Sequence, residues 1–270
     1  LPSVKEVFDT TPYTILVVDD NPDMTDFLKR TFEGYFKRII IAGDGVEALQ
    51  LVRSHVPDII VSDVMMPRMN GYKLCKTIKE DITISHIPVI LLTARDDRQS
   101  QISGYKNGAD GYLSKPFEVE MLTELIRNRL ENREYTKKRY LNAGLIPTPE
   151  ESTISLTDET FLIKLNSIIQ ENIDNTNLGI QFICQEVGLG RSSLYNKLKA
   201  LTGMGANEYI SKLRIEKAIT LISGTDMPFS EIAEKTGFTT PSYFSTTFKQ
   251  YTGETPSQYK ERKKKGLADK

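Results

Sequence analysis

The sequence predicts an α/β domain of the doubly wound type followed by an all-α domain. Five short apolar runs alternate with helix-length stretches between residues 13 and 132, as is typical of a parallel sheet with crossover helices. Residues 147–152 have the composition of a linker, and no strand-like run follows Leu156. A chain of 270 residues with 39% hydrophobic content is long enough for two domains of medium size.

The first domain is expected to contain five strands, at residues 15–18, 38–41, 58–61, 89–92 and 111–113. Most of these runs are rich in Ile, Val and Leu without alternation, which indicates strands buried on both faces. The helical stretches between them imply βαβ crossovers. The predicted fold is therefore a flavodoxin-like, five-stranded parallel sheet.

Turn and capping residues predict where the helices of this domain begin. Asn21-Pro22 places a capping residue before a proline at the first helical position, and the turns at residues 43–45 and 69–71 precede the second and third helices. The fifth helix is expected from Glu118 to about Asn132. The domain would then span residues 12–132, with a linker over residues 133–157.

The second domain is expected to be helical over residues 158–262, followed by a basic tail at 263–270. A short helix from Gln181, a turn at 188–190 and a helix at 191–201 form one helix-turn-helix unit. Residues 229–253 repeat this layout, with the second helix at 241–251. An amphipathic helix at 206–223 joins the two units, so that their second helices would reach successive major grooves about 34 Å apart.

Composition and charge exclude several classes of protein. No run approaches the roughly 18 apolar residues of a transmembrane helix, and residues 1–3 lack the pattern of a signal peptide. Cys75 and Cys184 lie far apart without a CxxC pattern, which favours a reducing cytoplasm over a disulfide framework or a zinc ribbon. Because the first residue is not Met, the chain is expected to be processed or cut from a longer protein.

The charge is unevenly distributed along the chain. The part from Leu178 carries 14 Lys and Arg against 9 Asp and Glu, whereas the preceding part carries 21 against 27. A basic second half is suited to a polyanion such as DNA. The alternative for the basic tail is an ordinary solvated end.

Polar residues follow four of the predicted strands, and they are Asp19, Asp20, Asp63, Thr93 and Lys115. In a doubly wound sheet these strand ends converge on one crevice. Three carboxylates repel one another unless a cation lies among them, and Mg²⁺ is the natural occupant. This set predicts phosphoryl transfer to Asp63, with Lys115 and Thr93 binding the product oxygens. The alternative for any one Asp is an ordinary helix cap.

The segments at residues 15–22, 60–71 and 108–117 resemble the receiver domain of two-component response regulators. This resemblance implies that Asp63 is the phosphoacceptor and that Asp19, Asp20, Asp63 and the Met65 carbonyl surround Mg²⁺. It also implies that Thr93 is the switch hydroxyl, Tyr112 the switch aromatic and Lys115 the phosphoryl-pairing lysine. The family has a cis bond at Lys115-Pro116. Because Thr93 and Tyr112 can respond to the added phosphoryl charge only by moving the fourth strand and its neighbours, we expect the output surface to be the fourth helix, the fifth strand and the fifth helix.

Residues 229–234, 237–238, 242–249 and 253–260 resemble the signature of AraC/XylS-type DNA-binding domains. The resemblance assigns seven residues to the core, namely Ile232, Ala233, Phe238, Phe244, Phe248, Pro256 and Tyr259. Outward positions are candidates for DNA contact: Arg191, Ser192, Tyr195, Asn196 and Lys199 on the first recognition helix, and Ser242, Ser245, Thr246 and Lys249 on the second. The second helix lacks an outward Arg or Gln, so the first is expected to dominate specificity. The alternative for each residue is an ordinary polar helix face.

These features predict a transcription regulator of a two-component phosphorelay that binds DNA in a phosphorylation-dependent manner. A histidine kinase, in cis or in trans, would phosphorylate Asp63. The phosphorylated receiver would then dimerise, which strengthens binding to repeated DNA sites. RNA polymerase is expected as a further partner. The fragment itself is not expected to be an enzyme, since it accepts and slowly loses an aspartyl phosphate. A phosphatase would need a general acid near Asp63 and a substrate cap, and neither is apparent.

The order of the two domains also resembles the C-terminal part of hybrid two-component sensors, which combine kinase and regulator in one chain. This resemblance implies targets among carbohydrate-utilisation genes and a location at the cytoplasmic end of a membrane-anchored sensor, in which the full-length chain is a histidine kinase. Two alternatives stay open. One is a stand-alone response regulator, and the other is a receiver used as a docking module without DNA binding.

Overall fold

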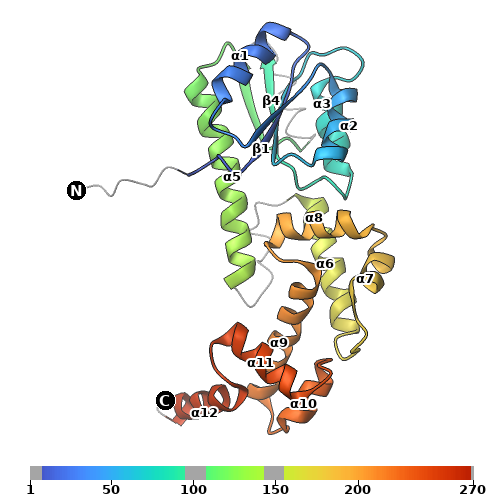
Figure 1. Ribbon diagram of the computed structural model, residues 1–270, viewed down its shortest axis with the longest axis vertical. Coiled ribbons are helices and arrows are strands. Elements are labelled where there is room, and N and C mark those ends of the chain that lie inside the picture. The colour runs from blue at the N-terminus through green and yellow to red at the C-terminus, as the bar shows by residue number, and fades with distance from the viewer. Residues whose placement is uncertain (1–7, 95–107, 143–154, 269–270) are drawn as a thin grey trace, which may run out of the picture. The chain divides into compact units, whose positions relative to one another are not determined.

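The computed structural model describes residues 8–94, 108–142 and 155–268 (Figure 1). The chain divides into two compact units, the first made chiefly of the chain up to Tyr140 and the second chiefly of the chain from Thr160. The first unit contains a β-sheet with helices on both faces, and the second is helical. Both fold classes agree with the sequence prediction. No helix in the described ranges is long and apolar enough to cross a membrane.

The sheet of the first unit consists of five parallel strands in the order β2-β1-β3-β4-β5. The strands are β1 (Thr14–Val18), β2 (Arg38–Ala42), β3 (Ile59–Asp63), β4 (Val89–Ala94) and β5 (Gly111–Lys115). Each overlaps a predicted strand. Since β1 pairs with both β2 and β3, the carboxyl ends of β1 and β3 are adjacent. This order places the ends of the central strands side by side at one edge of the sheet.

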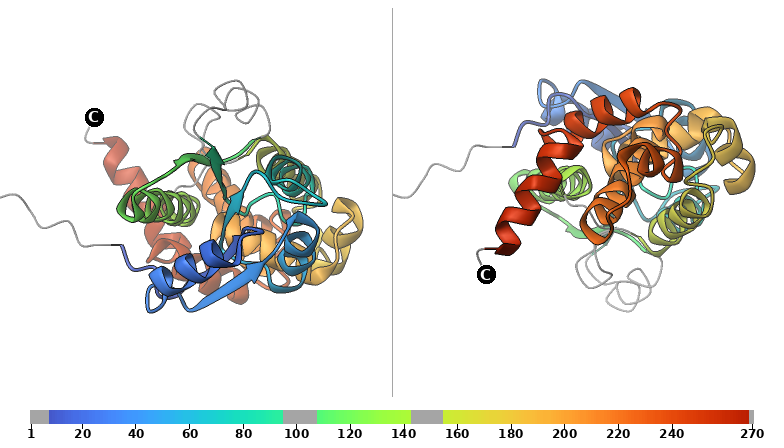
Figure 2. Two further views of the ribbon diagram at one scale, coloured as in Figure 1. Left: turned by 90° about the horizontal axis from the view of Figure 1, so that it is seen from above. Right: turned by 90° about the horizontal axis from the view of Figure 1, so that it is seen from below.

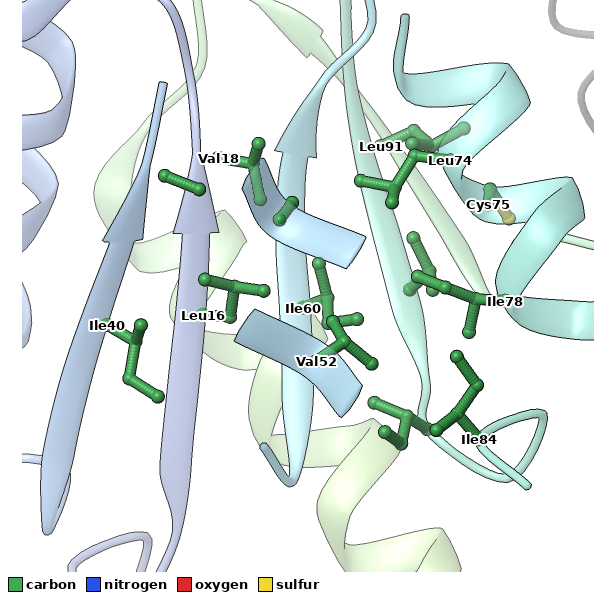
Figure 3. Close-up of a cluster of buried hydrophobic side chains, with 14 of the residues drawn as sticks. Leu16, Val18, Ile40, Val52, Ile60, Leu74, Cys75, Ile78, Ile84 and Leu91 are labelled. Atoms are coloured by element: carbon green, nitrogen blue, oxygen red, sulfur yellow. The ribbon is translucent and has the colours of Figure 1, made fainter. Parts of the chain in front are cut away.

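Two hydrophobic clusters cover the two faces of the sheet. On one face, strand side chains pack with α1 (Pro22–Phe32) and α5 (Val119–Asn142). On the other face they pack with α2 (Gly45–His55) and α3 (Gly71–Glu80), as the left-hand view of Figure 2 also shows. Figure 3 labels members of the second cluster: Leu16, Val18, Ile40, Val52, Ile60, Leu74, Cys75, Ile78, Ile84 and Leu91. Burial on both faces explains why the strand sequences do not alternate.

Helix α5 continues to Asn142, beyond the end expected near Asn132. The added turns lack a continuous apolar stripe and combine one buried aromatic residue, Tyr140, with polar contacts. Arg133 Nη1 donates to the Asp58 carbonyl at 3.0 Å, and Lys137 Nζ lies 2.5 Å from Glu134 Oε1. A charged stretch of this kind has the composition of a linker, so hydrophobic periodicity underestimates the helix. The fourth helix of the expected output surface falls within residues 95–107 and lies outside the described residues.

The second unit contains α6 (Leu156–Glu171), α7 (Ile180–Val187), α8 (Arg191–Thr202), α9 (Ala206–Gly224), α10 (Phe229–Lys235), α11 (Pro241–Thr252) and α12 (Pro256–Ala268), α6 beginning in the first unit. The pairs α7–α8 and α10–α11 are the two predicted helix-turn-helix units, and α9 joins them. Gly188 and Gly237 adopt φ values of 72°, which glycine tolerates without the steric penalty of a Cβ atom. All seven predicted core residues are buried.

Candidate functional site

Two buried carboxylates and one ammonium meet at the carboxyl edge of the sheet. Asp19 directly follows β1 and is 3% exposed, and Asp63 ends β3 and is 7% exposed. Lys115, at the end of β5, places its Nζ 2.9 Å from Asp19 Oδ2 and 2.5 Å from Asp63 Oδ1. The structure therefore brings these three predicted site residues together. Asp20 is adjacent in sequence but exposed.

Hydrogen bonds hold both carboxylates in place. Asp63 Oδ2 accepts from the Met65 amide at 2.7 Å, and Asp19 Oδ1 accepts from the Asn21 amide at 2.9 Å. Each carboxylate thus has one oxygen bound to backbone and the other facing Lys115. Met65 is 71% exposed, and the loop that follows β3 brings it to the edge of the site.

Lys115 remains charged in this environment. Burial opposes the positive charge, but hydrogen bonds from the ammonium to Asp63 and Asp19 outweigh this effect and raise the pKa of Lys115 above its ordinary value. The Lys115-Pro116 bond is cis, as the family resemblance implied.

Two glycines allow close backbone contacts around the β3–α3 loop, and the sequence alone did not predict these contacts. A Cβ atom on Gly71 would lie 2.2 Å from the Asp63 carbonyl oxygen, so α3 begins directly against the strand end. A Cβ atom on Gly45 would lie 2.6 Å from the Met69 carbonyl oxygen, which accepts a hydrogen bond from the Gly45 amide at 3.1 Å. The sequence showed glycine turns at both positions but not which segments approach them.

An ion pair in the same loop was also missed. Asp44 is 3% exposed, and its Oδ1 caps α2 by accepting from the Val46 and Glu47 amides. Its other oxygen, Oδ2, forms an ion pair with Arg68, which has a positive φ of 60°. Asp44 therefore connects the start of α2 to the loop that carries Met65. The Asp-Gly pair in the sequence indicated a turn, and no local signal pointed to Arg68 as the partner.

The two predicted switch residues lie on neighbouring strands. Thr93 on β4 is 1% exposed, and its hydroxyl has no hydrogen-bond partner among residues 8–94, 108–142 and 155–268. Tyr112 on β5 is half-buried and packs against the hydrophobic cluster shared with α2 and α3. A buried hydroxyl without a partner is costly, and it supplies a donor for an incoming oxygen ligand.

The chemistry of the donor set fits Mg²⁺. Asp19 and Asp63 each direct a carboxylate oxygen at the same ammonium, so a cation is favoured between them. No group of three His, Cys, Asp or Glu side chains that could hold a metal ion occurs in the part of the chain that the structure describes. Two carboxylates are nevertheless enough, because Mg²⁺ usually takes one or two and completes its shell with water and phosphoryl oxygens.

The predicted DNA-contacting residues lie mostly on exposed surface of the second unit. On α8, Arg191, Ser192, Tyr195, Asn196 and Lys199 are all exposed, and on α11, Ser242, Thr246 and Lys249 are exposed while Ser245 is half-buried. Each set lies on the second helix of a helix-turn-helix unit, the helix that enters the major groove in such motifs.

The expectation that the second helix lacks an outward Gln is wrong. Gln250 is exposed in the last turn of α11, and Tyr243, also missed, is 52% exposed in its first turn. The buried positions Phe244, Thr247 and Phe248 define the inner face and place both residues outside it. Helical spacing from the predicted core residues could have identified them.

Comparisons with known proteins give the family. Residues 15–127 match the family model of the response regulator receiver domain, and residues 183–262 match that of a helix-turn-helix domain, which is of AraC type. Response regulator MprA from Mycobacterium sp. (strain KMS) is 38% identical over 165 residues, which cover 56% of this chain and 70% of that protein. The chain belongs to the response regulators. A receiver domain implies a histidine kinase as partner, and the helix-turn-helix domain implies DNA.

A second relative shares both units of this response regulator. Histidine kinase P4 from Formosa agariphila is 41% identical over 249 residues, which make up 92% of this chain and 18% of that protein. The chain therefore spans a small part of that relative's length. Among solved structures, the receiver domain of Francisella response regulator 1452 is 36% identical, with a TM-score of 0.41, and the match covers 44% of this chain and 98% of that chain.

Proposed function

We propose that this response regulator accepts a phosphoryl group on Asp63 and thereby changes its binding to specific DNA sequences. The observation that carries the proposal is the placement of the Asp63 carboxylate, which is buried between the Lys115 ammonium and the Met65 amide. An Asp63 oxygen attacks the phosphorus atom of a phosphohistidine, and the bond from phosphorus to the histidine nitrogen breaks as the new P–O bond forms.

The surrounding residues stabilise the phosphorylated form. Lys115 provides the positive charge that pairs with a phosphoryl oxygen, and the buried hydroxyl of Thr93 donates a hydrogen bond to another. Tyr112, one strand away, then moves inward as Thr93 shifts. Bound Mg²⁺ would supply charge neutralisation, held by Asp19, Asp63 and the Met65 carbonyl, with Asp20 contributing through water.

The second unit provides the output. We assign base and phosphate contacts to the exposed residues of α8 and α11, with Lys199 and Lys249 holding phosphates and Asn196 contacting base edges. Receiver dimerisation would place two such units on repeated sites, and RNA polymerase is a further partner. The domains that go with this assignment are residues 12–132 and 158–262, and α5 continues to Asn142 within the segment 133–157 that joins them.

We further propose that the chain is the output part of a hybrid sensor whose kinase acts in cis. Support comes from histidine kinase P4 of Formosa agariphila, because the region that matches this chain makes up 18% of that longer protein. Carbohydrate-utilisation genes are the proposed targets, since the resemblance of the domain order to hybrid sensors implies them. A kinase acting in trans on a stand-alone regulator is the alternative.

Capture of genomic fragments with and without beryllofluoride tests this function. The chain is incubated with Mg²⁺ and sheared DNA, using beryllofluoride to mimic the aspartyl phosphate. We expect enrichment of a repeated motif chiefly with the mimic. Equal enrichment would refute control of DNA binding by phosphorylation, and no enrichment in either condition would favour a receiver that only docks to proteins.

The variant Asp63→Ala tests the phosphoacceptor directly. With acetyl phosphate as donor, we expect intact-mass spectra to show loss of the added phosphoryl group in Asp63→Ala, because Asp63 carries the carboxylate that contacts both Lys115 and the Met65 amide. Asp26→Asn is the matched control, since Asp26 is exposed on α1. A normal yield of phosphorylated Asp63→Ala would contradict the assignment.

A further inference from the structure

Arg214, in the middle of the joining helix α9, is a buried arginine that contacts the segment before the first helix-turn-helix unit and the turn of the second unit. Its residue exposure is 9%. The Nε atom donates to the Ile173 carbonyl at 3.3 Å, and Nη2 donates to the Asn175 carbonyl at 2.7 Å. Both carbonyls belong to the segment between α6 and α7, directly before the first helix-turn-helix unit. A planar guanidinium holds its donors in a fixed fork, so Nε and Nη2 bond the two carbonyls in one defined geometry, whereas a lysine ammonium is a compact charge on a flexible stem.

The same guanidinium also contacts the turn of the second unit. Its central carbon lies 6.0 Å from the centre of the Phe238 ring, in the turn between α10 and α11. A Cβ atom on Gly237 would lie 2.3 Å from the Ile173 carbonyl oxygen and 2.7 Å from Arg214 Nη2. The turn of the second unit therefore approaches the entry to the first as closely as backbone permits, and only glycine fits there.

A second contact joins the far end of α11 to the joining helix. The Tyr251 hydroxyl donates to the Glu208 carbonyl at 2.9 Å, in the first turn of α9. That turn directly follows α8, the first recognition helix. Two connections therefore join the second recognition helix α11 to α9. Tyr251 makes the first from the last turn of α11, and Arg214 makes the second through Phe238 and Gly237, which precede α11.

We infer that Arg214, with Tyr251, is a positioning residue that locks the two recognition helices into one rigid body and thereby fixes the spacing of DNA sub-sites that the chain accepts. The inference rests on the proposed function, because it concerns how the second unit contacts DNA. Neither residue needs to touch DNA. A rigid pair gains from its second contact only when both sub-sites match its geometry, whereas a loose pair tolerates several gaps.

Selection from randomised duplexes tests the inference on the whole chain with Mg²⁺ and beryllofluoride. For the wild type we expect two-part sites separated by a single gap. For Arg214→Lys and Tyr251→Phe we expect broader gaps or loss of the second part. Affinity for the first part alone should stay within about twofold, while affinity for the two-part site should fall by about tenfold or more. Arg53→Lys and Tyr35→Phe, at exposed positions of the first unit, are the matched controls.

The outcomes distinguish a failure of the proposed function from a failure of this inference alone. A wild type that selects no sequence overturns the proposed function and this inference with it. A wild type that selects two-part sites with several gaps, or variants that keep the wild-type gap and affinity, overturn the inference alone. If Arg214→Lys fails to fold by circular dichroism, Tyr251→Phe decides, because it removes one partly exposed hydrogen bond and no core atom.

Discussion

Replacing Gly71 by alanine tests the close approach of α3 to the strand that carries Asp63. The new Cβ atom would lie 2.2 Å from the Asp63 carbonyl oxygen and 3.0 Å from Val64 Cα. Both are backbone atoms at the carboxyl end of the central strand β3, so neither can rotate away. The first turn of α3 must move by roughly 1 Å to restore an ordinary contact distance.

The size of the effect follows from two opposing contributions. Forcing a methyl group into a packed site costs about 1–3 kcal/mol, and a backbone clash of this depth belongs near the upper end. Alanine recovers at most roughly 0.5–1 kcal/mol through its better helix preference, because Gly71 is the first residue of α3. The net loss for Gly71→Ala is therefore about 2 kcal/mol, which lowers the Tm of the first unit by roughly 8 °C.

Calorimetry of the whole chain measures this shift, because the two compact units can give separate transitions. Gly43→Ala is the control within the same unit, since its Cβ atom would meet only the flexible Glu47 carboxylate at 3.6 Å. We also expect Gly71→Ala to accept phosphate from acetyl phosphate more slowly, because the Asp63 backbone is displaced. A Tm within about 1 °C of the wild type would refute the reasoning.

Three further predictions concern buried polar groups. Burial raises the pKa of the Cys75 thiol to about 12, so iodoacetamide should modify half-buried Cys184 in the folded chain and leave Cys75 unmodified, as peptide mass spectra would show. Burial raises the pKa of Glu216 from its ordinary value of 4.5 to about 7, although the nearby Lys212 opposes this shift. Between these two pH values, the folded state therefore keeps a proton on Glu216 that the unfolded state releases. Stability should then fall as pH rises from 4.5 to about 7, and Glu216→Gln should abolish this slope in thermal melts. Thr93→Val removes a buried hydroxyl that has no hydrogen-bond partner among the described residues, so the free energy of unfolding should stay unchanged or rise by up to about 1 kcal/mol in thermal melts, while DNA binding should lose its response to beryllofluoride.

The sequence predicted the elements whose signals are local. Continuous runs of Ile, Val and Leu predicted four strands, because strands buried on both faces need no polar residues, and the weaker run at residues 111–113 predicted the fifth. The alignment of Asp19, Asp63 and Lys115 also followed, since parallel strands end at the same edge of the sheet. The helix-turn-helix units were found from glycine positions and from the spacing of aromatic core residues such as Phe244 and Phe248.

The features that escaped prediction depend on contacts between distant segments. Asp44 pairs with Arg68 across 24 positions, and Arg214 reaches Ile173 across 41. Nothing near either residue in sequence indicates its partner. The extension of α5 escaped for a different reason, since polar contacts such as that of Arg133 with the Asp58 carbonyl stabilise it without an apolar stripe. Periodicity reports burial of apolar side chains and is insensitive to helices held in this way.

The Asp63 site of the first unit and the Arg214 contacts of the second unit together restrict the ways in which phosphorylation can change DNA binding. In the proposed reaction, a phosphoryl group on Asp63 adds about −1.5 to −2 charge at a site where one ammonium faces two carboxylates, so the response begins with Lys115 and Thr93 inside the first unit. In the second unit, the Arg214 contacts fix the recognition helices relative to one another. The proposed signal therefore acts on which units come together on DNA rather than on the gap between α8 and α11. On this argument, beryllofluoride changes the affinity for repeated sites and leaves the gap within each site unchanged.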